Sequence, residues 1–239
     1  MVDALFGVPR LARVYDALDA DRSDLEHYAA MVTEFGARQV LDVGCGTGEL
    51  ACLLARDGVD VVGVDPAEAS LEVARGKEFA DGVRWIHGDA TTLPPLQVDL
   101  AVMTGNVAQV FLTDEDWSAT VNGVHGALKP GGRFVFETRD PARRAWEEWT
   151  REHTHQTVPT ADGTVESWGE LLSVELPYVS FRGTYVFSDG AVLTSESTLR
   201  FRERGEVEES LTAAGFAVDA VREAPDRPGK EFVFVARKQ

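Results

Sequence analysis

The stretch VLDVGCGTG, residues 40–48, decides the fold that this chain is expected to adopt. Its first residues read as a short buried strand, and three glycines at alternate positions follow. A helix is expected next, because leucines within residues 49–54 fall at helical spacing and Gly58 stands where a helix commonly ends. Glycine lacks a side chain, so the backbone of such a turn can bend sharply and lie against a flat ligand. The stretch therefore predicts a ligand site where a buried strand runs into a helix.

The next strand narrows the class of ligand. Residues 60–64 read as a second buried strand, which ends at Asp65, a residue placed to accept hydrogen bonds from a ribose. The dinucleotide fingerprint G-x-G-x-x-G would need its third glycine one position after Gly48. A phosphate-binding loop would need Lys where this chain has Glu49. The turn thus keeps the nucleotide-site arrangement of an open α/β sheet but matches neither pattern, and glycines used only for packing are the alternative.

Composition and charge limit the partners of the chain. Its 239 residues, 44% of them hydrophobic, suffice for one α/β domain or for a domain with one sizeable insertion. The formal net charge of −17 opposes a nucleic-acid partner, because phosphate contacts by Lys and Arg supply most of that affinity. No run approaches the roughly 18 apolar residues of a membrane helix. We therefore expect no nucleic-acid and no membrane partner, and a monomer or homodimer.

The N-terminus and the cysteines indicate a cytoplasmic protein. Residues 1–10 carry an acidic residue and lack the basic and apolar regions of a signal peptide. Cys45 and Cys52 lie too close together for a disulfide framework, so their expected role is that of small apolar filler. No cluster of His, Cys and Asp has metal-ligand spacing, so no metal is expected.

Strands and helices are expected to alternate through residue 137, and strands to dominate afterwards. The expected helices are residues 11–37 with a break at 21–24, 48–57, 67–75, 115–128, 142–149 and 206–214. The expected strands are residues 39–43, 60–64, 83–87, 99–103, 134–137, 165–176, 178–187, 191–201, 217–222 and 231–237. Residues 141–201 are thus predicted to form a three-stranded antiparallel insertion over the carboxyl ends of the parallel strands. The remaining core of the α/β fold would comprise residues 1–140 and 202–239.

This order of elements resembles the class I S-adenosylmethionine (SAM)-dependent methyltransferases over residues 11–237. Two patterns carry the resemblance: D-x-G-x-G-x-G at residues 42–48, and Leu-Lys-Pro-Gly-Gly at residues 128–132 before a strand. The chain looks like the small-molecule subgroup of amino-sugar N-methyltransferases and their relatives, which also carry an antiparallel insertion after the fifth strand. The resemblance implies a Rossmann-like seven-stranded sheet, SAM as cofactor and S-adenosyl-L-homocysteine as product.

By the same resemblance, residues around the glycine turn hold the cofactor. Asp65 would bind the ribose, Asp89 would bind the adenine amino group, and Tyr15 would help to close the site. The alternatives are simple packing of Tyr15 on an amphipathic helix and an ordinary turn at Asp89. The expected cofactor-binding residues are Tyr15, Asp42, Gly44, Cys45, Gly46, Gly48, Asp65, Pro66, Asp89, Ala90, Thr104 and Asn106.

The methyl acceptor is expected beside the loop at residues 104–111, with the insertion as its cover. Asn106 and Gln109 could hold the acceptor, or they could cap the helix that follows. The sequence Asn/Asp-Pro-Pro-Tyr/Phe, which would signal methylation of DNA bases, is absent from this loop. A small molecule is therefore the expected acceptor. The aromatic residues that could line its pocket, or merely pack the insertion, are Trp146, Trp149, Trp168 and Tyr178.

No catalytic residue is assigned, because methyl transfer from a sulfonium is an in-line displacement that depends chiefly on positioning. A neutral amine needs little more than a proton acceptor, whereas a hydroxyl acceptor needs a general base. Arg139 could pair with an acidic acceptor or only with a neighbouring carboxylate. The candidates for a base are His125, His153, His155, Glu166 and Glu170, of which His153 and His155 are kept with Arg139 as candidate catalytic residues.

Three functions remain open. The first is a SAM-dependent methyltransferase that acts on nitrogen or oxygen of a small molecule, with an amino sugar or another secondary metabolite as an example. The second is an NAD(P)-dependent oxidoreductase, which would share the glycine turn and Asp65 but not the glycine spacing. The third is a SAM-binding protein without transferase activity, because methyl transfer leaves no obligatory catalytic residue to check.

Overall fold

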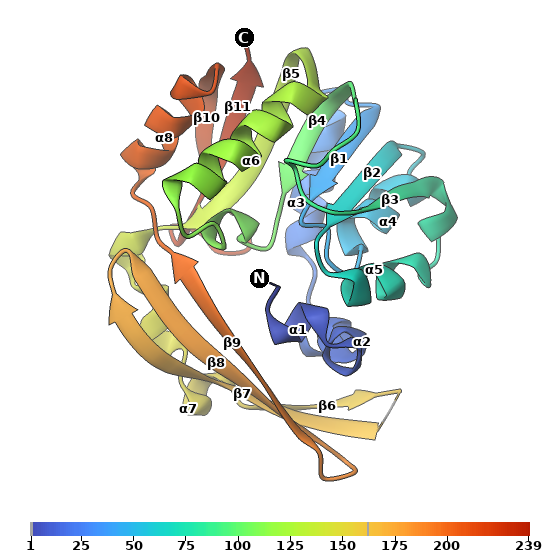
Figure 1. Ribbon diagram of the computed structural model, residues 1–239, viewed down its shortest axis with the longest axis vertical. Helices are drawn as coiled ribbons and strands as arrows, with labels where there is room; N and C mark the ends of the chain where they lie inside the picture. The colour runs from blue at the N-terminus through green and yellow to red at the C-terminus, as the bar shows by residue number, and fades with distance from the viewer. Residues whose placement is uncertain (1, 162) are drawn as a thin grey trace.

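A seven-stranded sheet forms the centre of the chain (Figure 1). The computed structural model describes residues 2–161 and 163–239. The strands of this sheet are β1 (Gln39–Val43), β2 (Asp60–Asp65), β3 (Val83–His87), β4 (Val98–Met103), β5 (Leu128–Arg139), β10 (Phe216–Glu223) and β11 (Glu231–Lys238). Their order is β10-β11-β5-β4-β1-β2-β3, and β11 alone runs antiparallel to its two neighbours. This is the Rossmann-like sheet that the resemblance implies.

Helices pack on both faces of the sheet, because its central strands are apolar on both sides. Val40 packs with α3 and α4, whereas the next residue, Leu41, packs with α6 and α8. Successive side chains of a strand point to opposite faces, so one strand supplies both layers of the core. The helices are α1 (Ala4–Gly7), α2 (Pro9–Leu18), α3 (Asp24–Glu34), α4 (Glu49–Arg56), α5 (Glu68–Arg75), α6 (Asp114–Ala127), α7 (Arg151–Thr154) and α8 (Arg204–Ala213).

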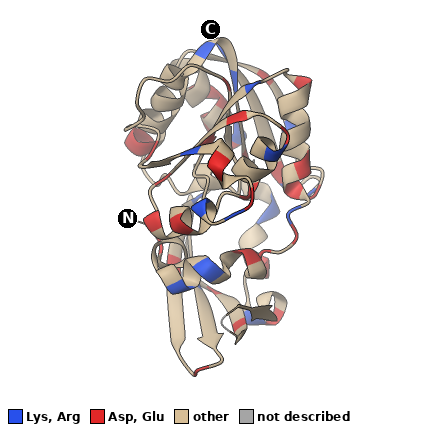
Figure 2. Cartoon of the chain, turned by 90° about the vertical axis from the view of Figure 1, so that its right-hand side faces the viewer, with Lys and Arg blue, Asp and Glu red and all other residues tan. Residues whose placement is uncertain are grey.

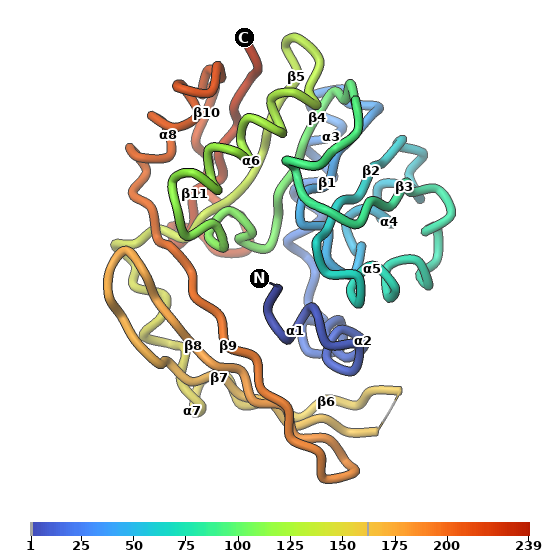
Figure 3. The backbone as a smooth tube through the Cα atoms, in the orientation of Figure 1, coloured from blue at the N-terminus to red at the C-terminus, as the bar shows by residue number. Residues whose placement is uncertain are grey.

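A second, four-stranded antiparallel sheet follows β5. Its strands, in spatial order, are β6 (Gln156–Thr160), β7 (Gly163–Glu175), β8 (Tyr178–Phe187) and β9 (Val192–Arg200). Figures 1 and 3 show this sheet at one end of the molecule, with α1 and α2 between it and the larger sheet. Val165 and Phe187 pack there against Leu11 and Val14 of α2. The face that carries Val165 and Phe187 is called the inner face below.

The structure corrects three of the expected elements. The sequence analysis missed β6, because its residues QTVPT include a proline and few apolar side chains, as sheet edges tolerate. The expected helix at 142–149 is two short 3₁₀ turns, Pro141–Arg143 and Ala145–Glu148, since Arg144 adopts a left-handed conformation with φ 50°. Residues 128–132, which were expected to precede the strand at 134–137, are the first part of β5, where Gly131 has φ 77°.

No helix within residues 2–161 or 163–239 combines the length and the apolar character that crossing a membrane would require. Cys45 and Cys52 are both buried and free. Within the same ranges, no group of three or more His, Cys, Asp or Glu side chains is arranged to hold a metal ion.

Candidate cofactor and acceptor site

The three glycines of the turn after β1 have different roles. All of them adopt positive φ, at 72° for Gly44, 53° for Gly46 and 81° for Gly48. A Cβ on Gly44 would lie 2.8 Å from the Val107 side chain, and one on Gly48 would lie 2.6 Å from the Trp85 ring. A Cβ on Gly46 would meet nothing within 4 Å. Gly44 and Gly48 are therefore required for packing, and Gly46 leaves open space that suits a flat ligand.

Asp65 joins the end of β2 to this turn. One carboxylate oxygen accepts a hydrogen bond from Gly46 N at 2.8 Å, and the other accepts from Ala67 N at 2.7 Å. Asp65 is buried, and burial raises the pKa of its carboxyl against the lowering effect of these two bonds. A carboxylate has about four acceptor positions, so two remain for hydroxyl groups of a ligand.

Asp42 lies within the sheet next to the turn and is 1% exposed. Its Oδ1 atom has no hydrogen-bond partner among the described residues. Burial, and then the nearby Asp65 carboxylate, raise the pKa of Asp42 to about 7. The sequence predicted the position of Asp42 but gave no indication of this raised pKa.

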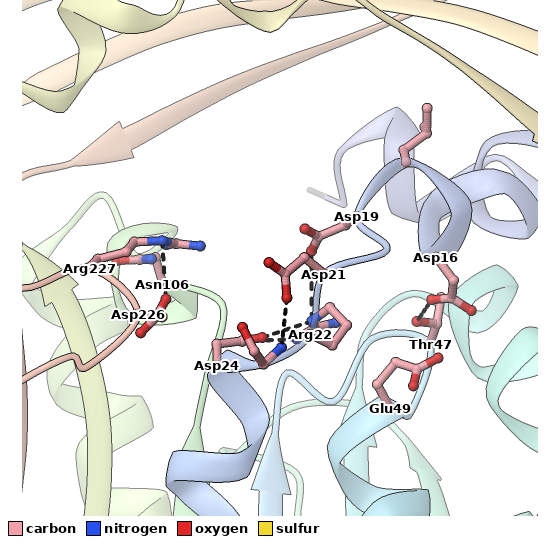
Figure 4. Close-up of polar contacts among 12 residues, drawn as sticks. Asp16, Asp19, Asp21, Arg22, Asp24, Thr47, Glu49, Asn106, Asp226 and Arg227 are labelled. Carbon is pink, nitrogen blue, oxygen red and sulfur yellow. Dashed lines mark hydrogen bonds and ion pairs between the residues drawn. The ribbon is translucent and has the colours of Figure 1, made fainter.

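The N-terminal helix α2 is tied to the glycine turn. Thr47 Oγ1 donates a hydrogen bond to Asp16 Oδ1 at 2.5 Å, and Figure 4 shows these two side chains together beside Glu49. Lys77 Nζ pairs with Asp16 Oδ2 at 2.7 Å and also with Glu49. Tyr15, one residue earlier, packs against the Phe6 ring with centroids 5.4 Å apart. These contacts hold α2 over the turn, where the sequence analysis placed only Tyr15.

The segment after β3 shows mainly local contacts. Asp89 is exposed, and its Oδ1 accepts hydrogen bonds from the backbone and the side chain of Thr91. Ala90 is buried, and its carbonyl oxygen fills the space that a Cβ on Gly123 would need. Pro66 O lies 3.1 Å from His87 Nε2. The turn at Asp89 is the ordinary loop geometry that was the alternative for this residue, so a role at the adenine stays a prediction.

Asn106 and Gln109 lie in the loop that follows β4 and Thr104. Both are buried, at 3% and 1% exposure. Asn106 Nδ2 donates to Glu231 Oε1 at 3.1 Å, and Gln109 Oε1 accepts from Arg139 Nη1 at 2.9 Å. Arginine only donates and an ionised carboxylate only accepts, so these partners fix the orientation of both amides. Asn106 Oδ1 and Gln109 Nε2 are left without a partner in the described part of the chain.

Neither amide caps α6, although capping was the alternative role for them. The N-cap of α6 is Thr113, whose side chain accepts from Asp116 N at 3.0 Å. Asn106 instead adopts a left-handed conformation with φ 59°, and its backbone N–H donates to Glu137 Oε1 at 2.6 Å.

Glu137 and Tyr28 form a buried pair that the sequence analysis missed. The Tyr28 hydroxyl donates a short hydrogen bond to Glu137 Oε2, although 109 residues separate the two in the chain. Burial raises the pKa of Glu137 to about 7, against the lowering effect of the bonds from Tyr28 and Asn106. Glu231 lies close by and also pairs with Arg227 Nη1 at 2.8 Å. Figure 4 shows Arg227 beside Asn106. No local pattern in the sequence links these elements.

The inner face of the insertion carries one part of the expected aromatic set. Trp149 packs against Phe181 with ring centroids 4.8 Å apart, and the Arg139 guanidinium lies 5.5 Å from the Trp149 ring. Phe181 shares the strand face of Val179, Tyr185 and Phe187, because it lies an even number of residues from each. Trp149 and Arg139 therefore lie between the insertion and the core, as an acceptor pocket would require. Trp146 is 2% exposed against Phe201 and serves packing.

Trp168 and the histidine candidates lie elsewhere. Trp168 follows the inner-face residue Ser167, so it points to the outer face. His155 stacks on Trp168, and His155 Nε2 lies 2.9 Å from Glu166 Oε1 on that same face. Glu170 lies an even number of residues from Trp168, so it also faces outward. The structure thus separates His155, Glu166, Glu170 and Trp168 from the glycine turn.

The other two histidines are also remote from a reacting centre. His153 is exposed, and its Nδ1 lies 2.9 Å from Thr150 Oγ1, the N-cap of α7. His125 is in the last turn of α6, directly before β5 begins, so it lies at the opposite edge of the sheet from the glycine turn. Burial lowers the pKa of His125, whose ring packs on Phe216.

Comparison with known proteins identifies the domain. Residues 40–132 match a methyltransferase domain family. An uncharacterized methyltransferase of Oceanobacillus iheyensis is 32% identical over 114 residues, which are 46% of this chain and 53% of that protein. The matched segment thus spans about half the length of that relative. A putative methyltransferase of Geobacillus sp. (strain WCH70) is 28% identical over 218 residues, which are 85% of each chain.

The fold extends the match beyond that domain. The structure of SAM-bound CalS10, an amino pentose methyltransferase from Micromonospora echinaspora, superposes with a TM-score of 0.76 at 24% identity. The superposition covers 95% of this chain and 97% of CalS10, so it includes the insertion. Residues 40–132 thus match a methyltransferase domain, and the chain as a whole shares the fold of the SAM-bound methyltransferase CalS10.

Proposed function

We propose that this chain transfers a methyl group from SAM to a small-molecule acceptor. The observation that supports this most directly is the open space at Gly46, into which a Cβ would project, beside the Asp65 carboxylate. A ribose fits this arrangement, because Asp65 has acceptor positions left for hydroxyl groups. The residues proposed to hold SAM remain those expected from the sequence, namely Tyr15, Asp42, Gly44, Cys45, Gly46, Gly48, Asp65, Pro66, Asp89, Ala90, Thr104 and Asn106.

The chemistry requires little of the protein beyond positioning. SAM supplies a methyl group that is already activated by its sulfonium. The glycine turn and α2, tied together by Asp16 and Thr47, would hold the cofactor, and the insertion would exclude water. Holding the nucleophile in line with the methyl group can contribute about 7 kcal/mol or more to the reduction of the barrier.

The placement of the histidine candidates supports an amine as the attacked group. The three histidines considered as general bases lie on the outer face, on an exposed helix or at the opposite sheet edge. A hydroxyl acceptor would need such a base, whereas a neutral amine reacts through its own lone pair. Asn106 Oδ1 and Gln109 Nε2 add one free acceptor and one free donor. A ligand with an amine and a neighbouring hydroxyl, such as an amino sugar, would satisfy both once the loop admits it.

The charge of the molecule supports a small acceptor rather than a macromolecule. Figure 2 shows acidic residues in red mixed with basic residues in blue over the side that it presents. The net charge of −17 opposes binding to a phosphate backbone. The amino-sugar assignment takes further support from CalS10, which is an amino pentose methyltransferase. A monomer or homodimer and a cytoplasmic location remain our predictions for the chain.

Methyl transfer from radiolabelled SAM tests this proposal. The purified chain is incubated with a panel of amino sugars, simple amines, alcohols, DNA, RNA and protein. We expect label in one or more small amines and none in the macromolecules. Label only in a macromolecule would overturn the small-molecule assignment. SAM binding without transfer to any member of a broad panel would favour the non-catalytic alternative, and binding of NADH in place of SAM would favour the oxidoreductase.

A further inference from the structure

The insertion grips the loop that follows β4, here called the post-β4 loop, residues 107–113. Three side chains donate to backbone carbonyls of this loop: Tyr178 at the start of β8, Arg200 at the end of β9, and Arg202, which lies two residues after β9 where the chain returns to the core. Arg202 donates to Ala108 O at 3.4 Å, Phe111 O at 2.8 Å and Thr113 O at 3.2 Å. Arg200 Nη1 and the Tyr178 hydroxyl both donate to Leu112 O at 3.1 Å.

Arg202 donates most of these hydrogen bonds. It is 4% exposed and lies 5.3 Å from the centroid of the Trp117 ring. Burial, and then the neighbouring Arg200, lower its pKa to about 10, so the side chain keeps its charge at neutral pH. Within residues 2–161 and 163–239 no carboxylate lies within ion-pair distance of it, and its partners are carbonyl oxygens. Asp114 and Glu206 lie near enough to attract the charge, but neither pairs with it directly. A buried charge without a direct ion pair is costly, so the three carbonyl partners compensate for part of its lost hydration.

The post-β4 loop follows Asn106 and contains Gln109, the two amide residues of the candidate acceptor site. Gln109 N donates to Asn106 O at 3.0 Å and closes a 3₁₀ turn, and Ala108 O within this turn is one of the carbonyls that Arg202 binds. Glu137 holds Asn106 from the core side, and Arg202 holds the following residues from the insertion side. Because Asn106 Oδ1 and Gln109 Nε2 are buried, the position of this loop decides whether a ligand can reach them.

We propose that Arg202 is a positioning residue, which fixes the post-β4 loop to the insertion and so sets where Asn106 and Gln109 stand toward the methyl acceptor. The insertion is then part of the acceptor site through the core loop that it holds, in addition to covering the site. The role of Arg202 in placing the methyl acceptor rests on the proposed function. The mechanical part, the fixing of the loop, can be measured without any acceptor.

Hydrogen exchange followed by mass spectrometry tests whether Arg202 fixes the post-β4 loop. Arg202→Met keeps most of the side-chain length but removes the donors, and Arg202→Lys restores one charged donor group. Arg204→Met is the matched control, because Arg204 is an exposed residue of α8 that pairs with Glu208. We expect the amides of Asn106, Gln109 and Val110 to exchange at least about tenfold faster in Arg202→Met, since charged hydrogen bonds are strong. Arg202→Lys should be intermediate, and Arg204→Met should match the parent.

Two results would overturn the proposal: unchanged exchange of the loop in Arg202→Met, or an equal increase in β5, which would mean a general loss of stability. If Arg202→Met does not fold, Tyr178→Phe replaces it, because it removes one bond to Leu112 O from a side chain that is 38% exposed. Tyr178→Phe should increase the exchange rates of the same amides by a smaller factor. Unchanged rates would contradict the proposal that these side chains fix the loop. SAM affinity is measured in parallel by calorimetry. A parent that does not bind SAM refutes the proposed function while leaving the exchange result valid.

Discussion

At the scale of single residues, the three glycines of the turn differ in the space around them. Neighbouring side chains occupy the space that a Cβ on Gly44 or Gly48 would need, so packing accounts for these two glycines. Of the three glycines in this turn, only Gly46 has free space at the position of a Cβ. A substitution at Gly46 can therefore test ligand binding with little disturbance of the core, whereas substitutions at the other two would test folding.

We expect Gly46→Ala to abolish SAM binding, because its methyl group would occupy the space assigned to the ligand. Gly36→Ala is a matched control, since Gly36 ends α3 with φ 61° and a Cβ there also meets nothing within 4 Å. Both variants should lose about 1–2 kcal/mol of stability from the left-handed backbone. Calorimetry should show no SAM binding in Gly46→Ala and unchanged affinity in Gly36→Ala. Parent-like affinity in Gly46→Ala would contradict the cofactor site.

Asp42 should make the free chain less stable as the pH rises. Its pKa is about 7 in the folded chain and 3.8 as the ordinary value, so between these values the unfolded chain releases a proton that the folded chain keeps. Rising pH therefore favours unfolding, by up to about 1.4 kcal/mol for each pH unit between the two pKa values. Asp42→Asn removes this effect. Urea unfolding at pH 5 and pH 8 should show a smaller decrease in unfolding free energy for Asp42→Asn than for the parent.

Asp81→Asn, which changes an exposed carboxylate, is the control for this comparison. It should lose stability with pH as the parent does. If Asp42→Asn and Asp81→Asn follow the same pH dependence, then Asp42 is ionised in the folded chain at neutral pH and the assignment of its raised pKa is wrong.

The sequence predicted residues better than it predicted their contacts. Asp42, Gly46 and Asp65 could be located because they belong to one strand–turn–helix–strand unit of local spacing. The Tyr28–Glu137 pair joins residues 109 positions apart, and no spacing rule connects them. The bond from Thr47 to Asp16 likewise depends on how α2 packs.

At the scale of elements, side chains that alternate along each strand give the insertion two different faces. One face packs on α2 and encloses Trp149 and Phe181, and the other carries Trp168 and His155 toward solvent. The sequence predicted the strands β7, β8 and β9 but not which face would turn inward. That choice depends on the apolar residues Leu11 and Val14 of α2, more than 140 residues earlier in the chain. Strand alternation fixes the faces only relative to each other.

Trp149→Ala should impair methyl transfer, whereas Trp168→Ala should not. The two residues are both tryptophans of intermediate exposure in the insertion, so they are a matched pair for inner and outer face. With the acceptor found in the panel, we expect kcat/KM for that acceptor to fall at least about tenfold in Trp149→Ala, because its ring lies between insertion and core. SAM affinity should be unchanged in both variants. Equal effects of both substitutions on turnover would mean that the inner face does not form the acceptor site.

At the scale of the whole molecule, the cofactor should be held between three separate parts of the chain. The glycine turn belongs to the large sheet, α2 is tied to it by Asp16 and Lys77, and the insertion packs on α2. A ligand at the turn would therefore stabilise an arrangement that includes the N-terminus and the insertion. Binding to the folded chain alone raises its stability by mass action.

Thermal unfolding can therefore identify the cofactor by class. At a SAM concentration 100 times its Kd, the stabilisation is about 2.7 kcal/mol. For a chain of this size that corresponds to a rise in Tm of about 5–10 °C. We expect SAM and S-adenosyl-L-homocysteine to raise Tm by this amount, and NADH to leave it unchanged, because Gly48 stands one position too early for the dinucleotide fingerprint. Gly46→Ala should show no rise with any of them, which separates binding at the turn from binding elsewhere. A rise with NADH that Gly46→Ala removes, and none with SAM, would instead show that the glycine turn serves a dinucleotide.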